Sequence, residues 1–172
     1  MHLVLLCGPA FSGKTSLARA LEARGALRIS LDDMLRERGL EPGAGVPVNA
    51  WEDASSAACL LIAAAAQRAQ HVVLDDTLCY RFLRDRYRQL GEGAGMHVVL
   101  AVLTISASEV RARVAEDLRS PRRRGIDAQL LESHLASFEW PSSDEPHVRL
   151  DATHGIEQQL ACLKQSVGPT NR

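Results

Sequence analysis

The segment that most constrains the fold of this chain is CGPAFSGKTSLARAL, at residues 7–21. Gly8 to Thr15 fit the pattern G-x-x-x-x-G-K-[ST], between an apolar run at 2–7 and a segment of helical period. In that setting the glycines let backbone N–H groups converge on phosphate oxygens, and the start of the helix adds positive charge at the same place. The pattern predicts a strand, a phosphate-binding loop and a helix at the start of an α/β domain.

This loop predicts a nucleoside triphosphate site with Mg²⁺. Lys14 would reach the β- and γ-phosphates, and the Thr15 hydroxyl would bind the metal. The chain has only two lysines, Lys14 and Lys164, against eighteen arginines. A lysine at this position of the loop is therefore stronger evidence for phosphate binding. The residues expected to contact the nucleotide are Gly8, Ala10, Phe11, Ser12, Gly13, Lys14, Thr15 and Ser16.

Apolar runs alternate with helical segments along the whole chain. The runs lie at 2–7, 26–30, 71–75, 97–103 and 147–151, and the helical segments at 14–24, 31–39, 50–69, 80–90, 106–119, 127–138 and 155–167. Runs that are apolar along most of their length predict strands buried on both faces of a parallel sheet. We expect a single α/β domain over 1–167, with 168–172 as a tail.

Composition limits the kind of protein and its partners. The net charge of −1 gives no general affinity for nucleic acid or membrane surfaces, and the longest apolar run, at 57–66, is too short to span a bilayer. The four cysteines lack metal-ligand spacing, and the start of the chain lacks the basic region of a signal peptide. We expect a cytoplasmic protein with reduced thiols, as a monomer or homodimer, with no membrane partner.

Two aspartates end the third apolar run, in HVVLDD. Water molecules on Mg²⁺ need acceptors, and Asp75 at the end of a strand would supply one. Asp76 and Thr77 would project toward the substrate. The alternative is that either aspartate only caps the helix that follows.

Two further aspartates follow the second apolar run, in RISLDD, at the same edge of the predicted sheet. Asp32 is our candidate for the general base that takes the proton of an attacking hydroxyl, with Asp33 beside it on the substrate side. Arg36, one turn further, would hold a substrate anion or lie in solvent. The alternative for Ser30 and the two aspartates is an N-cap of the next helix.

Arginines gather between 111 and 124, around a proline break. Phosphoryl transfer is aided by positive charge, and we expect this arginine-rich segment to form a mobile lid that supplies such charge and excludes water. Arg113 and Arg119 are expected at the nucleotide, with Arg119 catalytic. Arg122 to Arg124 would belong to the same lid or form a solvated or RNA-contacting loop, although few aromatic residues lie nearby to stack bases. Trp51, after the loop EPGAGVP at 41–47, would stack on an acceptor ring or anchor its own helix.

Four motifs follow one another along the chain: GPAFSGKT, SLDD, VVLDDT with CYRFLRDRYRQL, and the arginine segment before FEWPSSDEP. Their order resembles that of the P-loop kinase-like ATPases. That group includes phage polynucleotide kinase, zeta-toxin and chloramphenicol phosphotransferase, and the likeness is greatest to L-seryl-tRNA(Sec) kinase and its elongator-associated relatives. The resemblance implies a five-stranded parallel sheet of order 2-3-1-4-5 and transfer of the γ-phosphate of ATP, with Mg²⁺, to a hydroxyl. It also implies that Asp32 is the base and Arg119 the lid arginine.

The sequence departs from the pattern of the tRNA kinases at two points. Thr77 stands where the tRNA kinases commonly have asparagine, and their additional C-terminal RNA-binding region is missing from the sequence. We therefore expect an acceptor that is a small molecule or a nucleotide or RNA end, with RNA less favoured. The alternative function is an ATP-hydrolysing regulatory or RNA-binding module without phosphate transfer, which would not need a carboxylate base.

Overall fold

A computed structural model describes residues 1–43, 45–119 and 128–167 of the chain. In these residues a parallel sheet has five strands in the order β2-β3-β1-β4-β5. The strands are β1 (His2–Cys7), β2 (Leu27–Ser30), β3 (Val72–Asp75), β4 (His97–Thr104) and β5 (Val148–Asp151). The fold class and the strand order predicted from the sequence are both confirmed.

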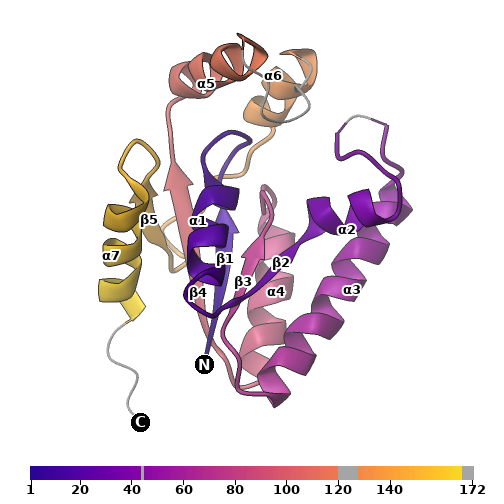
Figure 1. The fold of residues 1–172 in the computed structure, drawn as a ribbon, viewed down its shortest axis with the longest axis vertical. Coiled ribbons are helices and arrows are strands. Elements are labelled where there is room, and N and C mark those ends of the chain that lie inside the picture. The colour runs from indigo at the N-terminus through magenta and orange to yellow at the C-terminus, as the bar shows by residue number, and fades with distance from the viewer. Residues whose placement is uncertain (44, 120–127, 168–172) are drawn as a thin grey trace.

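Helices cover both faces of this sheet (Figure 1). They are α1 (Lys14–Glu22), α2 (Leu31–Glu37), α3 (Val48–Gln67), α4 (Arg81–Gly93), α5 (Ala107–Arg119), α6 (Ala128–Ala136) and α7 (Ile156–Val167). Helices α3 and α4 pack on one face, and α1 and α7 on the other. Helices α5 and α6 lie above the carboxyl ends of the strands, near the loop after β1 (Figure 1).

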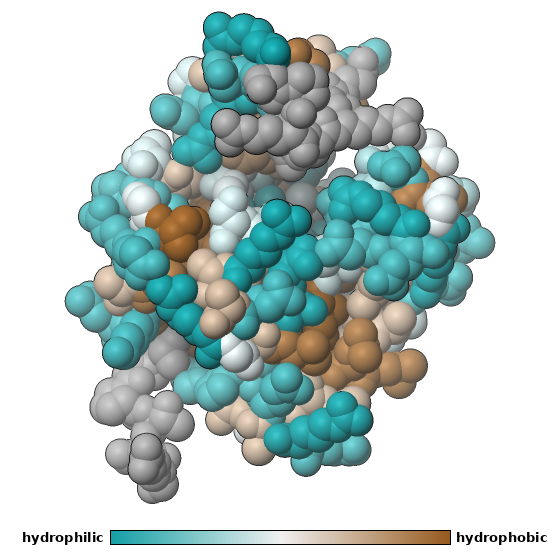
Figure 2. Space-filling model, in the orientation of Figure 1, coloured by the Kyte–Doolittle hydropathy of each residue, from teal (hydrophilic) through white to brown (hydrophobic). Residues whose placement is uncertain are grey.

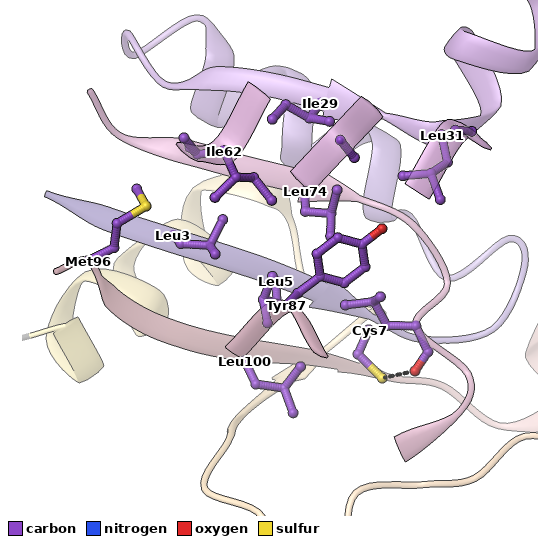
Figure 3. Packing of buried hydrophobic residues seen from close by; sticks show 14 of the residues in the cluster. Leu3, Leu5, Cys7, Ile29, Leu31, Ile62, Leu74, Tyr87, Met96 and Leu100 are labelled. Carbon is purple, nitrogen blue, oxygen red and sulfur yellow. Dashed lines mark hydrogen bonds between the residues drawn. The ribbon is translucent and has the colours of Figure 1, made fainter. Parts of the chain in front are cut away.

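The core explains why the strands read as continuous apolar runs. Along β1, Leu3 and Leu5 point into the cluster under α3 and α4, while Val4 and Leu6 point into the cluster under α1 and α7. A strand buried on both faces needs an apolar residue at every position. Figure 3 shows the first cluster, in which the ring of Tyr87 lies among the leucines.

The surface in Figure 2 is mostly hydrophilic, with an apolar area over the lower part of α3. This helix carries the exposed Leu60 and Leu61. No helix among the described residues is both long and apolar enough to cross a membrane. The expected tail, 168–172, lies outside the described residues.

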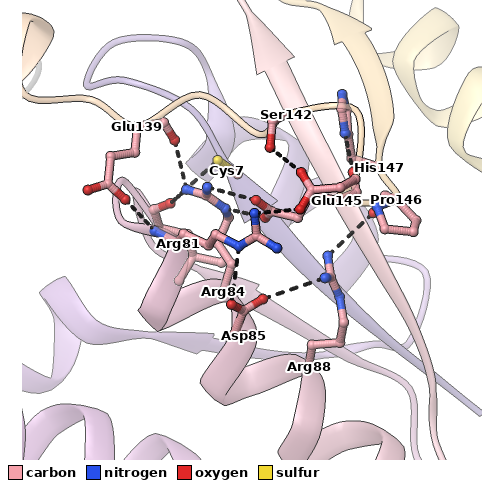
Figure 4. A network of polar contacts seen from close by, with 12 residues as sticks. Cys7, Arg81, Arg84, Asp85, Arg88, Glu139, Ser142, Glu145, Pro146 and His147 are labelled. Carbon is pink, nitrogen blue, oxygen red and sulfur yellow. Dashed lines mark hydrogen bonds and ion pairs between the residues drawn. The ribbon is translucent and has the colours of Figure 1, made fainter.

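A buried ion pair joins α4 to the segment before β5 (Figure 4). Glu145 accepts hydrogen bonds from Nε and Nη2 of Arg84, at 2.5 and 3.0 Å, and both side chains are almost fully buried. The remaining Arg84 donor, Nη1, reaches the carbonyl oxygens of Leu78 and Glu139, both at 2.9 Å. Arg84 therefore fixes three separate segments of the chain.

We expect Glu145→Gln to lower the free energy of unfolding by about 3 kcal/mol, because it leaves the buried Arg84 guanidinium without a counter-charge. Urea unfolding of both proteins measures this difference. The control is Glu157→Gln, which removes the partner of Arg24 from an exposed pair and should cost less than about 1 kcal/mol. Equal costs for the two variants would contradict the prediction.

Candidate active site

The loop between β1 and α1 has a backbone that suits phosphate binding. Gly13 caps α1 with φ of 98°, in the left-handed region that favours glycine. A Cβ on Gly8 would lie 2.9 Å from both the Leu103 carbonyl oxygen and Ser12 Oγ, so only glycine fits there. Phe11 also has a positive φ, of 62°, which is costly for a bulky residue and typical of functional loops.

The Lys14 side chain is buried inside this loop. Its Nζ donates hydrogen bonds to the carbonyl oxygens of Gly8 and Pro9, both at 2.8 Å. These contacts keep the ammonium group at the start of α1, where the helix dipole also favours an anion. The loop thus presents a fixed positive charge next to a row of backbone N–H groups.

Thr15 and Asp75, the two residues predicted to bind Mg²⁺, contact each other. The Thr15 hydroxyl donates to Asp75 Oδ1 at 3.3 Å, and Asp75 is buried at the end of β3. Burial raises the pKa of Asp75, although Arg28 and Lys14 oppose the shift. The hydroxyl and carboxylate oxygens fit Mg²⁺. The described residues contain no group of three His, Cys, Asp or Glu able to hold a metal ion, so Mg²⁺ here would take its other ligands from water and phosphate.

Asp33, at the start of α2, is held by two arginines. Its Oδ2 accepts from Arg28 Nη2 at 2.7 Å, and its Oδ1 accepts from Arg36 Nη1 at 2.8 Å. Burial alone would raise the pKa of Asp33, but the hydrogen bond and charge of Arg28, together with Arg36, outweigh burial and lower it. The carboxylate of Asp33 is therefore held ionised and in place.

Asp32 is in a different position, with its side chain half exposed. Its nearest ion-pair contact is a long one, 3.8 Å from Oδ2 to Arg36 Nη2. Burial raises the pKa of Asp32, and the nearby Asp75 adds to the shift while Arg36 opposes it. The N-cap of α2 is made by Ser30, whose Oγ accepts from the Asp33 N–H at 3.3 Å. The side chain that caps α2 is therefore that of Ser30 and not that of Asp32.

Asp76 and Thr77 follow β3, and Thr77 contacts the phosphate loop. The Thr77 N–H donates to Asp76 Oδ1 at 2.7 Å, and the Thr77 carbonyl accepts from the Gly8 N–H at 3.1 Å. Burial raises the pKa of Asp76 to about 6, and the charges of Asp32 and Asp75 add to the rise. A carboxyl group whose pKa is raised this far by burial is typical of a functional site.

We expect Asp76→Asn to raise the free energy of unfolding by about 1–3 kcal/mol at pH 8, because the variant no longer buries a charge. The folded state binds the Asp76 proton more tightly than the unfolded state, so this group costs stability as the pH rises from about 4 to about 6. Urea unfolding at pH 4.5 and pH 8 should show a larger stabilisation at pH 8. An equal effect at both pH values would contradict the prediction.

The predicted arginines take separate positions. Arg113 donates from Nη1 to the Phe11 carbonyl at 3.0 Å and from Nη2 to the Ala152 carbonyl at 2.7 Å, so it braces the phosphate loop. Arg119, at the end of α5, is exposed and pairs with Glu116 of the same helix. Arg122 to Arg124 lie outside the described residues.

Three more residues predicted for the site are Trp51, Ser16 and Arg36. Trp51 is half-buried and packs against the core cluster under α3 and α4. Ser16 is exposed on α1. Arg36 is half exposed and engaged with Asp33, as described above.

Two further residues of the site are absent from the sequence prediction. Arg28 contacts both Asp33 and Asp75. His134 of α6 accepts a hydrogen bond at Nε2 from the N–H of Ala10, at 3.4 Å. Arg28 could have been noticed as a charged residue inside an apolar run, whereas no sequence pattern indicated His134.

An open hollow of about 420 Å³ lies elsewhere, at the ends of β4 and β5. Its lining includes Ser106, Trp140 and Arg149, and none of the predicted site residues. The residues suited to phosphate chemistry are instead gathered at the ends of β1, β2 and β3.

The chain matches a known protein family over most of its length. A family described as AAA domain matches residues 3–141 of the chain. No curated protein sequence matches it. The family match includes the phosphate loop and all four aspartates of the site.

Solved structures share the fold at low sequence identity. A gluconokinase from Sinorhizobium meliloti 1021 is 19% identical, with a TM-score of 0.71, covering 96% of this chain and 91% of that one. The APS kinase CysC of Mycobacterium tuberculosis, in complex with AMPPNP and APS, is 18% identical with a TM-score of 0.65, covering 94% and 95%. Kti12 of Chaetomium thermophilum, in complex with ADP-AlF3, is 19% identical with a TM-score of 0.67, covering 95% and 96%. The fold is therefore that of P-loop kinases and their ATPase relatives.

Proposed function

The chain belongs to the AAA domain family, and we propose that it is an ATP-dependent phosphotransferase that moves the γ-phosphate of ATP to a hydroxyl group. The observation that carries this proposal is the meeting of two kinds of residue at one sheet edge. Lys14, Thr15 and Asp75 suit the phosphates and Mg²⁺, while Asp32 suits an attacking hydroxyl. A protein that only binds nucleotide has no need of Asp32.

The donor half of the site would hold ATP by its phosphates. The N–H groups from Ala10 to Ser16 and the Lys14 ammonium would bind them, while Thr15 and, through water, Asp75 would hold Mg²⁺. When bound, Mg²⁺ neutralises charge on the β- and γ-phosphates. Arg113 and Arg119 would lie on the nucleotide side. Arg113 acts there by bracing the Phe11 carbonyl, since its donors already engage backbone oxygens.

The acceptor half would bring the hydroxyl in line with the γ-phosphate. The hydroxyl oxygen forms a bond to phosphorus, the bond to the β-phosphate oxygen breaks, ADP leaves, and Asp32 takes the hydroxyl proton. Asp32 suits this role better than Asp33, whose two oxygens are engaged by arginines. Asp33, Arg36, Asp76, Thr77 and Trp51 would surround the acceptor, which we expect to be a small molecule or a nucleotide or RNA end.

The test is the fate of the label when γ-labelled ATP and Mg²⁺ are incubated with the protein and a panel of hydroxyl compounds. The panel contains sugars, sugar acids, nucleosides and oligonucleotides with a free 5′-hydroxyl. Transfer of label to one acceptor is the expected result. Label found solely as inorganic phosphate, with every acceptor, would overturn phosphate transfer and favour an ATP-hydrolysing module.

A further inference from the structure

The short strand β2 carries an arginine on the face that meets the phosphate loop. Leu27 and Ile29 point into the core under α3, so Arg28, between them, points to the opposite face. In the register of β2 and β3, Arg28 lies beside Val73, and Asp75 follows two residues later on the same face of β3. The strand geometry therefore brings the Arg28 side chain to the metal-site carboxylate.

The guanidinium of Arg28 joins two carboxylates. Its Nε donates to Asp75 Oδ2 at 3.2 Å, and its Nη2 donates to Asp33 Oδ2 at 2.7 Å. The Arg28 side chain is 12% exposed and that of Asp75 only 4%, so this contact is well shielded from solvent. A rigid planar fork holds two acceptors at a fixed separation, which a single ammonium group does not do.

These contacts continue in both directions along the sheet edge. On one side, Asp75 accepts from Thr15 of the phosphate loop through its other oxygen. On the other side, Asp33 accepts from Arg36 through its other oxygen, and Arg36 approaches Asp32. Arg28 is thus the central link between the residues suited to Mg²⁺ and those suited to the acceptor.

We propose that Arg28 is a positioning residue that fixes the Mg²⁺-binding carboxylate of Asp75 relative to the acceptor-side carboxylate of Asp33. The part that concerns the acceptor rests on the proposed function. The part that concerns Asp75 is measured with nucleotide and Mg²⁺ alone. Residues that orient a metal-binding carboxylate affect metal affinity and activity although they touch neither metal nor substrate.

The experiment uses Arg28→Lys, which keeps the positive charge and removes the fork. The affinity for AMPPNP without Mg²⁺ should stay unchanged, because Lys14 and the loop amides bind the phosphates. The gain in AMPPNP affinity on adding Mg²⁺ should fall about tenfold, and ATP turnover should fall about 10–100-fold. Arg24→Lys, in an exposed ion pair outside the site, is the matched control and should change neither quantity.

A second variant tests whether the loss of turnover comes from the broken link between the two carboxylates. Asp33→Asn breaks the same link from its more exposed end and should also lower turnover about tenfold. The double variant should be no slower than Arg28→Lys, because the link is already broken. Multiplication of the two losses would overturn the proposed link, and so would an Arg28→Lys protein with normal Mg²⁺ dependence and turnover. If Arg28→Lys altered the Mg²⁺ dependence while the unmodified protein phosphorylated no acceptor, the role of Arg28 would stand and the proposed function would be overturned.

Discussion

Replacing Lys14 by Gln is expected to lower the turnover of ATP by about 10²–10³-fold, because the site loses its fixed positive charge at the β- and γ-phosphates. Glutamine is of similar length and can still donate to the Gly8 or Pro9 carbonyl, so the loop should keep its shape. Release of ADP and phosphate measures turnover. AMPPNP binding should weaken as well, since in the proposed site the ammonium would contact the phosphates of the bound nucleotide.

The matched control for this change is Lys164→Gln. Lys164, the only other lysine of the chain, is exposed on α7, away from the phosphate loop. Its replacement should leave turnover and AMPPNP binding unchanged. If Lys14→Gln kept full turnover, the nucleotide would not bind at this loop and the whole assignment of the site would fail.

The fold was predictable because each element carries its own local signal. Strands β1 and β3 are buried on both faces and therefore read as unbroken apolar runs. The phosphate loop fixed the first strand, the first helix and the edge of the sheet at which ligands bind. The ends of α3 were less well predicted: it begins at Val48, directly after Pro47, rather than at residue 50.

The arrangement of the site was only partly predictable. The sequence places Asp32, Asp33 and Asp75 at one edge, because Asp75 ends a strand and the other two come just after one. It does not tell in which direction each side chain points. The structure distinguishes the two neighbours by their contacts: Asp33 accepts hydrogen bonds from two arginines, whereas Asp32 lies 3.8 Å from Arg36. Alternation along β2 could have placed Arg28 beside Asp75, had the register of the two strands been known.

The partners in contacts between a helix and a distant segment had no sequence signal. Glu145 and Arg84 lie far apart in the chain, and nothing around either residue indicates a buried pair. The sequence singled out Arg113 as a residue of the nucleotide site, but it gave no sign that its partners would be the Phe11 and Ala152 carbonyls. Such contacts are set by tertiary packing, and they decide which arginines brace the site.

Asp32→Asn is expected to lower phosphate transfer by about 10²–10⁴-fold while leaving ATP binding intact, because asparagine cannot accept the hydroxyl proton. AMPPNP affinity with Mg²⁺ checks the binding, and labelled γ-phosphate on the acceptor checks the transfer. In the unmodified protein, transfer should fall as the pH drops through the pKa of Asp32, which burial raises above the ordinary aspartate value. The acid limb of the pH profile should therefore lie at higher pH than that of an exposed carboxylate.

The control for Asp32→Asn is Asp53→Asn, a change of the same kind at an exposed residue of α3 whose nearest cation, Arg38, is 4.0 Å away. It should leave transfer and its pH profile unchanged. Asp33→Asn offers a sharper comparison, because it loosens the link to Arg28 but keeps the Asp32 carboxylate. It should slow transfer about tenfold and leave the acid limb in place. If Asp33→Asn abolished transfer while Asp32→Asn retained it, the proton acceptor would be Asp33, and its two arginines would have to release it when the acceptor binds.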